Sequence, residues 1–158
     1  KSLNKIKQEK KTKIPLLLKI SPDIEDGHIS EISDIAIKND ISAIILTNTS
    51  NSNRDNLISE MKKEEGGLSG EPLQQISTNM IKKFYKQLKG KIPIIGVGGI
   101  SSGKSAYEKI IAGASLLQLY TGFVYKGPMI VKNIKKELIQ ILKDEGISSI
   151  EEVIGKGL

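Results

Sequence analysis

Four short apolar runs divide this chain, and each is followed by a longer segment in which apolar residues recur with helical period. The runs are rich in Ile, Leu and Val and cover residues 14–20, 43–46, 92–97 and 114–120. Continuous apolar runs of this length are typical of strands buried on both faces of a parallel sheet. The alternation therefore predicts an α/β fold with a parallel sheet.

Helices are predicted after each of these strands. Pro22 and Asp23 are expected to open the first helix, which ends near Asn39. Its apolar face would comprise Ile29, Ile32, Ile35, Ala36 and Ile37. Further helices are predicted over residues 72–89, 103–112 and 128–143. Residues 47–71 are mostly polar and form a long loop, which usually indicates function or mobility.

The strand spacing is that of a (β/α)₈ barrel, but the chain is too short for a whole one. A complete barrel needs about 250 residues and eight strands, whereas these 158 residues supply four apolar runs. We therefore predict the C-terminal half of a barrel, in which four βα units form a single domain over residues 1–158. Such a half would expose two unpaired parallel edges, which folded proteins avoid. Because the chain does not begin with Met, we expect it to be a fragment of a longer protein.

Composition excludes several classes of protein. The absence of Cys excludes a disulfide framework, a thiolate nucleophile and a metal site built on sulfur, and we predict no metal site. No apolar run approaches the roughly 18 residues of a membrane span, and no signal peptide is readable. The net charge of +6 comes almost wholly from scattered Lys, Arg54 is the single Arg, and only 4% of residues are aromatic. We therefore predict no nucleic-acid binding, which usually concentrates Arg and aromatic side chains.

A glycine-rich segment follows the third predicted strand and opens a helix. Residues 96–103 read Gly-Val-Gly-Gly-Ile-Ser-Ser-Gly. Glycine lets backbone N–H groups approach a phosphate without an intervening Cβ, and a helix N-terminus adds partial positive charge. In (β/α)₈ barrels the loops after the last two strands commonly form a phosphate site. The residues that would form it here are Gly98, Gly99, Tyr120, Thr121 and Gly122, although a tight turn needing glycine is the alternative.

The same segment also fits the P-loop pattern, because Gly98 is followed after four residues by Gly103-Lys104-Ser105. A P-loop enzyme needs further strands and normally an apolar strand that ends in Asp to hold Mg²⁺. The strand predicted after Ser105 ends in Leu-Tyr-Thr, without Asp. The P-loop interpretation is therefore disfavoured.

Two other polar features fall at predicted strand ends. Lys19 lies among apolar neighbours, and because burying an unpaired ammonium is costly, it must reach either solvent or an anion. Its place at the end of a barrel strand favours the anion. Thr47, Asn48 and Thr49 follow the second strand, and the Asn amide can both donate and accept, which suits a planar heterocycle. An ordinary polar turn is the alternative for these three residues.

Two segments are uninformative about nucleophilic catalysis. Residues 66–72 could wrap closely around a ligand, but they form no nucleophile elbow because Glu71 stands where G-x-S-x-G requires glycine. His28 is the only histidine and is expected to be solvated. No histidine-based triad and no catalytic residue are predicted.

Several motifs taken in order resemble dihydroorotate dehydrogenase, specifically its quinone-dependent class. The resemblance rests on Leu-Lys-Ile-Ser-Pro-Asp at 18–23, Thr-Asn-Thr at 47–49, Gly-Gly-Leu-Ser-Gly-Glu-Pro-Leu at 66–73, Ile-Ile-Gly-Val-Gly-Gly-Ile at 94–100, Ala-Gly-Ala-Ser at 112–115, Tyr-Thr-Gly at 120–122 and Tyr-Lys-Gly-Pro at 125–128. It covers nearly the whole chain from Lys13 onward and maps onto the C-terminal half of the family.

The resemblance implies an FMN-containing (β/α)₈ barrel that oxidises dihydroorotate to orotate in pyrimidine synthesis and passes the electrons to a membrane quinone. It implies FMN contacts from Lys19, Thr47, Gly70, Gly99, Tyr120 and Thr121. It also implies that Asn48 and Thr49 hold the pyrimidine substrate. A location on the cytoplasmic side of a membrane, or otherwise in the cytoplasm, follows from the resemblance alone.

Parts of the family pattern are expected upstream of Lys1: the catalytic serine, the first FMN-binding loop and the N-terminal helices that contact quinone and membrane. We therefore hypothesise that this chain alone cannot complete the reaction. Three alternatives stay open: a split enzyme whose separate N-terminal half docks to complete the barrel, an inactive truncated product, and another FMN- or phosphate-binding barrel enzyme.

Overall fold

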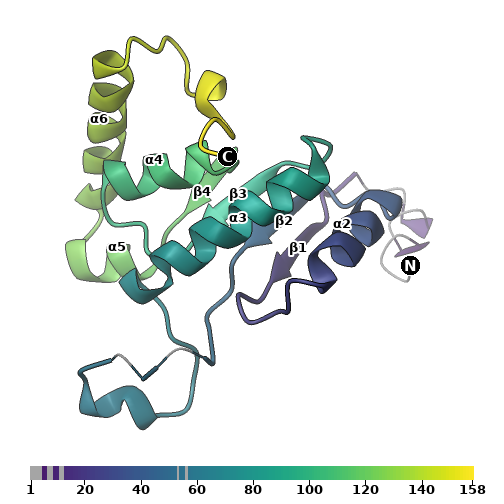
Figure 1. The fold of residues 1–158 in the computed structure, drawn as a ribbon, viewed down its shortest axis with the longest axis horizontal. Helices are drawn as coiled ribbons and strands as arrows, with labels where there is room; N and C mark the ends of the chain where they lie inside the picture. Colours follow the sequence, from purple (N-terminus) through teal and green to yellow (C-terminus); the bar gives the residue numbers. More distant parts are fainter. Residues whose placement is uncertain (1–4, 7–8, 11–12, 53, 56) are drawn as a thin grey trace.

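A parallel sheet lies at the centre of the protein in the computed structural model, which describes residues 5–6, 9–10, 13–52, 54–55 and 57–158. Its strands are β1 (Leu17–Ile20), β2 (Ala43–Leu46), β3 (Ile94–Val97) and β4 (Leu116–Gln118). Each strand pairs in parallel with the next along the chain, so that the order is β1-β2-β3-β4 (Figure 1). The predicted fold class is confirmed, because four parallel βα units in sequence order form half of a (β/α)₈ barrel.

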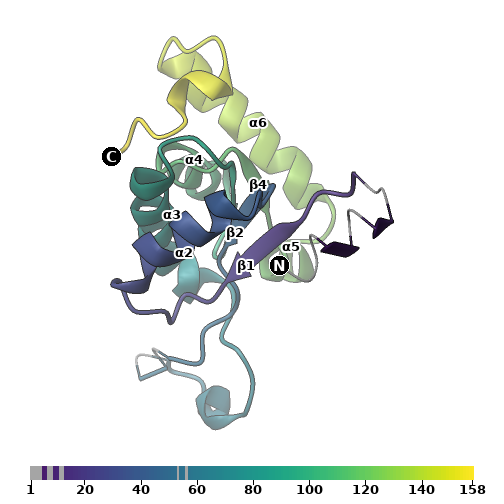
Figure 2. The same ribbon diagram turned by 90° about the vertical axis from the view of Figure 1, so that its right-hand side faces the viewer.

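Helices connect the strands and cover one face of the sheet. In chain order they are α2 (His28–Lys38), α3 (Gln74–Leu88), α4 (Gly103–Ile111), α5 (Thr121–Lys126) and α6 (Met129–Asp144). Short 3₁₀ turns cover Glu60–Lys63, Glu71–Leu73 and Ile150–Val153. α2 packs against α3, α3 against β2 and β3, and α4 against α6 (Figures 1 and 2). None of the helices in the described ranges is long and apolar enough to cross a bilayer.

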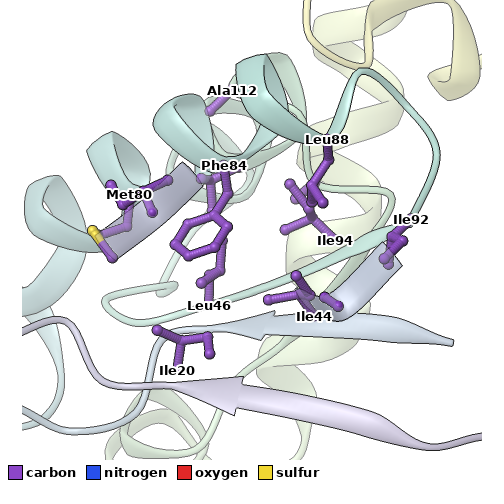
Figure 3. Close-up of a cluster of buried hydrophobic side chains, with 13 residues drawn as sticks. Ile20, Ile44, Leu46, Met80, Phe84, Leu88, Ile92, Ile94 and Ala112 are labelled. Atoms are coloured by element: carbon purple, nitrogen blue, oxygen red, sulfur yellow. The ribbon is translucent and has the colours of Figure 1, made fainter. Parts of the chain in front are cut away.

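The hydrophobic core lies between this layer of helices and the sheet. Alternate strand residues point toward the helices and pack around Phe84, which is fully buried (Figure 3). The labelled members of this cluster are Ile20, Ile44, Leu46, Met80, Phe84, Leu88, Ile92, Ile94 and Ala112. Burying these side chains is the main contribution that holds α2 and α3 against the strands.

The opposite face of the sheet is much less covered. Leu17 in β1 and Leu116 in β4 remain 38% and 61% exposed, although both are large apolar residues. Their strand neighbours Leu18 and Leu117 point the other way and pack against the core. In a complete barrel this second face lines the interior.

The first helix begins later than predicted. Pro22 and Asp23 do not open it, because residues 22–27 form turns and α2 starts at His28. The Asp23 carboxylate instead accepts hydrogen bonds from Ser50 Oγ (2.5 Å) and Asn51 N (2.8 Å), so it stabilises the start of a distant loop. A local pattern cannot distinguish this use of Asp from helix capping, because the partner lies far away in sequence.

The predicted apolar face of this helix is wrong at one position. Ile35 is 52% exposed, whereas Ser33 is 1% exposed. The Ser33 hydroxyl donates to Ile29 O (2.7 Å), which satisfies it inside the helix and allows its burial. His28 is exposed, as predicted.

Strand and helix boundaries also differ elsewhere. β1 and β3 begin after Pro15 and Pro93 rather than before them, because proline has no N–H for a sheet ladder. Residues 121–127, which connect the predicted strand at 114–120 to the predicted helix at 128–143, contain the additional helix α5. The 3₁₀ turn at Ile150–Val153 was not predicted either.

Candidate functional site

A cleft of about 1170 Å³ lies at the carboxyl ends of the strands. It is lined by Lys19 near the end of β1, by residues that follow β2, β3 and β4, and by much of the long loop between β2 and α3. Every site residue predicted from the sequence lines it: Lys19, Thr47, Asn48, Thr49, Gly70, Gly99, Tyr120 and Thr121. The carboxyl ends of neighbouring parallel strands meet at one edge of a sheet, so residues far apart in sequence converge there.

The first two strands supply an ammonium and a short polar segment to this cleft. Lys19 is exposed and lines the cleft beside β2, where its strand partner is Ile45. The backbone of the polar segment is fixed, since Thr47 N donates to Val97 O (3.0 Å) and Asn48 N donates to Ile20 O (2.8 Å). The Asn48 side chain is exposed and therefore available to a ligand.

Hydrogen bonds hold the long loop at the point where it leaves and re-enters the body of the protein. Ser50 and Leu68 form an isolated antiparallel bridge, with N···O distances of 3.1 and 2.7 Å. Ser50 is fully buried and donates to Asp23, as described above. Next to this bridge, a Cβ on Gly67 would clash with the Thr49 side chain. The bridge therefore brings residues 66–70 against the polar segment after β2.

Inside the loop, the Arg54 side chain donates hydrogen bonds to main-chain carbonyls of residues 62–66, in the second half of the loop. Its Nη1 donates to Glu64 O (2.5 Å) and Lys62 O (3.3 Å), and its Nη2 donates to Gly66 O. The five fixed donors of a guanidinium suit several carbonyls at once. Arg54 thus closes the loop upon itself above the cleft.

The two glycine segments meet the start of α5 across the cleft. A Cβ on Gly70, where φ is +85°, would lie 2.9 Å from Thr121 Cγ2. The Thr121 hydroxyl donates to Ser69 Oγ (2.9 Å), and Lys126 Nζ donates to Ser101 O (2.9 Å). The loops after β2, β3 and β4 are therefore tied together.

The glycine loop after β3 packs on the beginning of α3. Gly99 has a φ of +72°, and a Cβ there would lie 2.5–2.7 Å from the Cβ, Cα and N atoms of Gln74. A Cβ on Gly98 would lie 3.0 Å from Ser77 Cβ. Ser77 Oγ in turn donates to Val97 O (2.6 Å) at the end of β3. The close approach explains why these positions lack side chains.

The structure argues against the P-loop interpretation of this segment. Ser102 Oγ caps α4 by accepting a hydrogen bond from Ser105 N (3.2 Å), and Ser105 Oγ accepts in return from the N–H groups of Ser101 (2.9 Å) and Ser102 (3.0 Å). Gly103 N donates to Glu137 Oε2 (2.5 Å) of α6. Lys104 is exposed and does not line the cleft. The Gly103 and Ser105 amides of α4 are therefore bonded within the protein, which disfavours an anion at this helix start.

Charged groups of both signs line the cleft. They are Lys19, Arg54, Lys62, Lys126, Glu64, Glu65 and Glu71. Within the described ranges, no three His, Asp or Glu side chains gather into a cluster that could hold a metal ion. Outside the cleft, burial lowers the pKa of Lys109, which binds Gln74 O (2.5 Å), to about 8.

Comparison with known proteins decides the family of this chain. Residues 1–142 match the family model described as dihydroorotate dehydrogenase. The chain belongs to the dihydroorotate dehydrogenase family. Curated relatives named dihydroorotate dehydrogenase (quinone) include a mitochondrial protein of Arabidopsis thaliana (47% identity over 89% of this chain) and a protein of Trichodesmium erythraeum (45% over 98%). The mitochondrial protein of Mus musculus is 42% identical over 97% of the chain.

Solved structures of this dehydrogenase family share the fold. The crystal structure of the enzyme from Eimeria tenella in complex with ferulenol matches with a TM-score of 0.86 and 40% identity, over 90% of this chain and 38% of that chain. The chain spans only 31% of the length of the Arabidopsis protein and 43% of the Trichodesmium protein.

Several residues of the cleft and its surroundings were not predicted individually from the sequence. Ser69 Oγ accepts a hydrogen bond from the Thr121 hydroxyl, and Val97 and Leu119 are apolar residues that line the cleft. The anchors Asp23 and Ser50 were missed as a pair, although each follows a predicted strand end within four residues. Position relative to strand ends was the signal that could have identified them.

Proposed function

We propose that this chain supplies the C-terminal half of the flavin and substrate site of a quinone-dependent dihydroorotate dehydrogenase. The reaction would be the FMN-dependent oxidation of dihydroorotate to orotate in pyrimidine synthesis, with a quinone as electron acceptor. The observation that carries the proposal is the convergence of Lys19, Asn48, Gly99 and Thr121 on one cleft in a chain of this family.

The residues of the cleft fit a flavin mononucleotide. Gly70 and Gly99 bring bare backbone to the cleft wall where a Cβ would clash, which suits a phosphoryl group held by N–H donors. Thr121 and Tyr120 add hydroxyl groups beside them. Lys19 places a cation in the same cleft, where it would favour negative charge on a reduced ring. When bound, FMN would supply the hydride acceptor for the substrate and the electron donor for the quinone.

The polar segment after β2 would bind and orient the substrate. Asn48 can donate and accept at the same time, which matches the alternating N–H and C=O groups of a pyrimidine ring. Thr49 adds a hydroxyl on the same segment, and Thr47 N and Asn48 N fix its backbone. Holding the reacting carbon close to the flavin ring lowers the entropic part of the barrel enzyme's activation barrier.

The remaining half of the barrel would complete the site. The face of the sheet that carries Leu17 and Leu116 is exposed here, and in a full barrel it faces four more strands. We propose that these units, on the same polypeptide or on a separate one, bring the serine that accepts the substrate proton. They would also bring the contacts with the quinone and with the cytoplasmic side of a membrane.

Flavin binding by the purified chain tests the proposal directly. We expect FMN fluorescence to be quenched on titration with the chain, and we expect Lys19→Met to weaken binding about tenfold. Lys135→Met in α6, which is exposed and outside the cleft, is the matched control. If the chain binds no FMN, or if both variants bind it equally well, the proposed site is wrong.

Turnover measurements test whether the chain needs the other half of the barrel for activity. The chain alone should oxidise dihydroorotate at no measurable rate, because the proton acceptor and part of the ligand contacts are expected elsewhere. Addition of the corresponding N-terminal half of a relative should produce orotate, followed by its ultraviolet absorbance. Robust turnover by the chain without any added polypeptide would refute the proposed division.

A further inference from the structure

A lysine is buried behind the glycine loop, outside the cleft. Lys109 of α4 has no exposed surface, and its Nζ donates to Gln74 O (2.5 Å) and Thr78 Oγ1 (2.7 Å) of α3. Among the ion pairs of the described residues, none pairs Lys109 with a carboxylate. Burying an ammonium with neutral partners is unfavourable, and an apolar side chain of similar length would fill the same space without that penalty. Because of this penalty, we expect the role of the buried ammonium to lie in the hydrogen bonds of Lys109 with Gln74 and Thr78.

Lys109 and its neighbour hold one residue at two points. Glu108 Oε2 accepts a hydrogen bond from Gln74 Nε2 (2.8 Å), while Lys109 binds the main-chain carbonyl of the same Gln74. Thr78 Oγ1 also donates to that carbonyl (2.8 Å). Gln74 is the first residue of α3. The beginning of α3 is thus attached to α4 through both the side chain and the backbone of Gln74.

The residue held in this way supports the glycine loop directly. The atoms that a Cβ on Gly99 would strike are Gln74 N, Cα and Cβ, all within 2.7 Å of its ideal position. In the next turn, Ser77 contacts the position of Gly98 and donates to Val97 O (2.6 Å). A displacement of Gln74 by a fraction of an ångström would therefore displace Gly99, which lines the cleft.

We propose that Glu108 and Lys109 are positioning residues that hold the glycine loop in the form that binds the phosphoryl end of the flavin. The inference rests on the proposed function, because it assumes that this loop contacts the phosphate. It assigns no contact between either residue and the ligand. Its consequence is that the two residues affect binding of a phosphate monoester and not of the uncharged isoalloxazine ring.

The test compares FMN with riboflavin, which has the same ring but no phosphate. We expect Lys109→Met in the full chain to raise the dissociation constant for FMN about tenfold and to leave that for riboflavin nearly unchanged. Lys104→Met, on the exposed side of the same helix, is the matched control and should change neither. A merely structural role would weaken both ligands by the same factor, which would overturn the inference.

Amide hydrogen exchange supplies a readout that needs no flavin. Exchange at residues 98–101 should be faster in Lys109→Met than in the parent chain, while exchange in β1 and α2 should be unchanged. Unchanged exchange at 98–101 would overturn the inference. If Lys109→Met does not fold, Glu108→Ala, at a partly exposed position, replaces it in both measurements, and the expected change is about threefold.

The outcomes separate the two proposals. Failure of the parent chain to bind either flavin would refute the proposed function. Binding of FMN by the parent chain with the same FMN-to-riboflavin ratio in the folded variants would refute only the positioning role.

Discussion

At Gly99 the backbone lies closer to a neighbouring helix than any side chain would permit. Its φ of +72° lies in the left-handed region, and the first residue of α3 occupies the space of a Cβ. Gly146 has a similar φ of +67°, but nothing lies within 4 Å of its missing Cβ. A comparison of substitutions at the two glycines therefore distinguishes the cost of the left-handed backbone, which both share, from the cost of a steric clash, which only Gly99 has.

Gly146→Ala should lower the free energy of unfolding by about 1 kcal/mol, because only the left-handed conformation is penalised. Gly99→Ala should lower it by at least about 2 kcal/mol more, since the methyl group also collides with Gln74. Gly99→Ala should in addition abolish FMN binding, while Gly146→Ala should preserve it. Urea unfolding and FMN titration measure both effects. Equal destabilisation by the two substitutions would contradict the packing argument.

At the scale of elements, the contact between α3 and α4 contains a buried base. Burial lowers the pKa of Lys109 to about 8, and nearby Glu108 only partly opposes this shift. A folded-state pKa below the unfolded value means that the unfolded chain binds more protons between the two values. Stability should therefore rise as the pH increases from about 8 toward the ordinary lysine range.

The free energy of unfolding should increase by about 2 kcal/mol between pH 8 and pH 10 through Lys109 alone. Above pH 10 an opposite effect begins, because burial and a hydrogen bond to Glu145 raise the pKa of Tyr107 to about 12. Urea unfolding at pH 8, 9 and 10 should show this increase in the parent chain and in Lys104→Met, and its loss in Lys109→Met. An identical pH dependence in all three proteins would show that Lys109 is not responsible.

At the scale of the whole molecule, one face of the sheet remains exposed. Leu17 and Leu116 belong to β1 and β4, the two edges of the four-stranded sheet. An exposed apolar face between unpaired strand edges promotes association. In the relatives, which are more than twice as long, further chain is available to cover it.

Leu116→Lys should reduce self-association of this chain, because it places a charge on the exposed face in the edge strand β4. Ile139→Lys, at a similarly exposed position in α6, should leave self-association unchanged. Sedimentation velocity at increasing protein concentration measures both. The same Leu116→Lys substitution should impair docking of an N-terminal half. Self-association that both substitutions reduce equally would show that the sheet face is not the contact surface.

The chain's local pattern was sufficient for the order and type of its main elements. Runs of Ile, Leu and Val predicted four parallel strands, and helical periodicity predicted α3, α4 and α6 close to their observed bounds. Polar and glycine residues at or directly after the strand ends predicted Lys19, Thr47, Asn48, Thr49, Gly99, Tyr120 and Thr121 in the cleft, because parallel strands must end at the same edge, and the family resemblance added Gly70. These features depend on residues that are close together in sequence.

Only the tertiary structure decided which partner each polar group would take. Asp23 binds the loop at Ser50 rather than opening a helix, and Ser33 is buried in place of Ile35. The Gly103 amide at the start of α4 donates to Glu137, and Lys109 is attached to Gln74. Each of these outcomes depends on contacts between segments far apart in the chain or on how one helix sits in the core. Periodicity reports which face of a segment is apolar, but it does not report which distant donor or acceptor will lie opposite a given side chain.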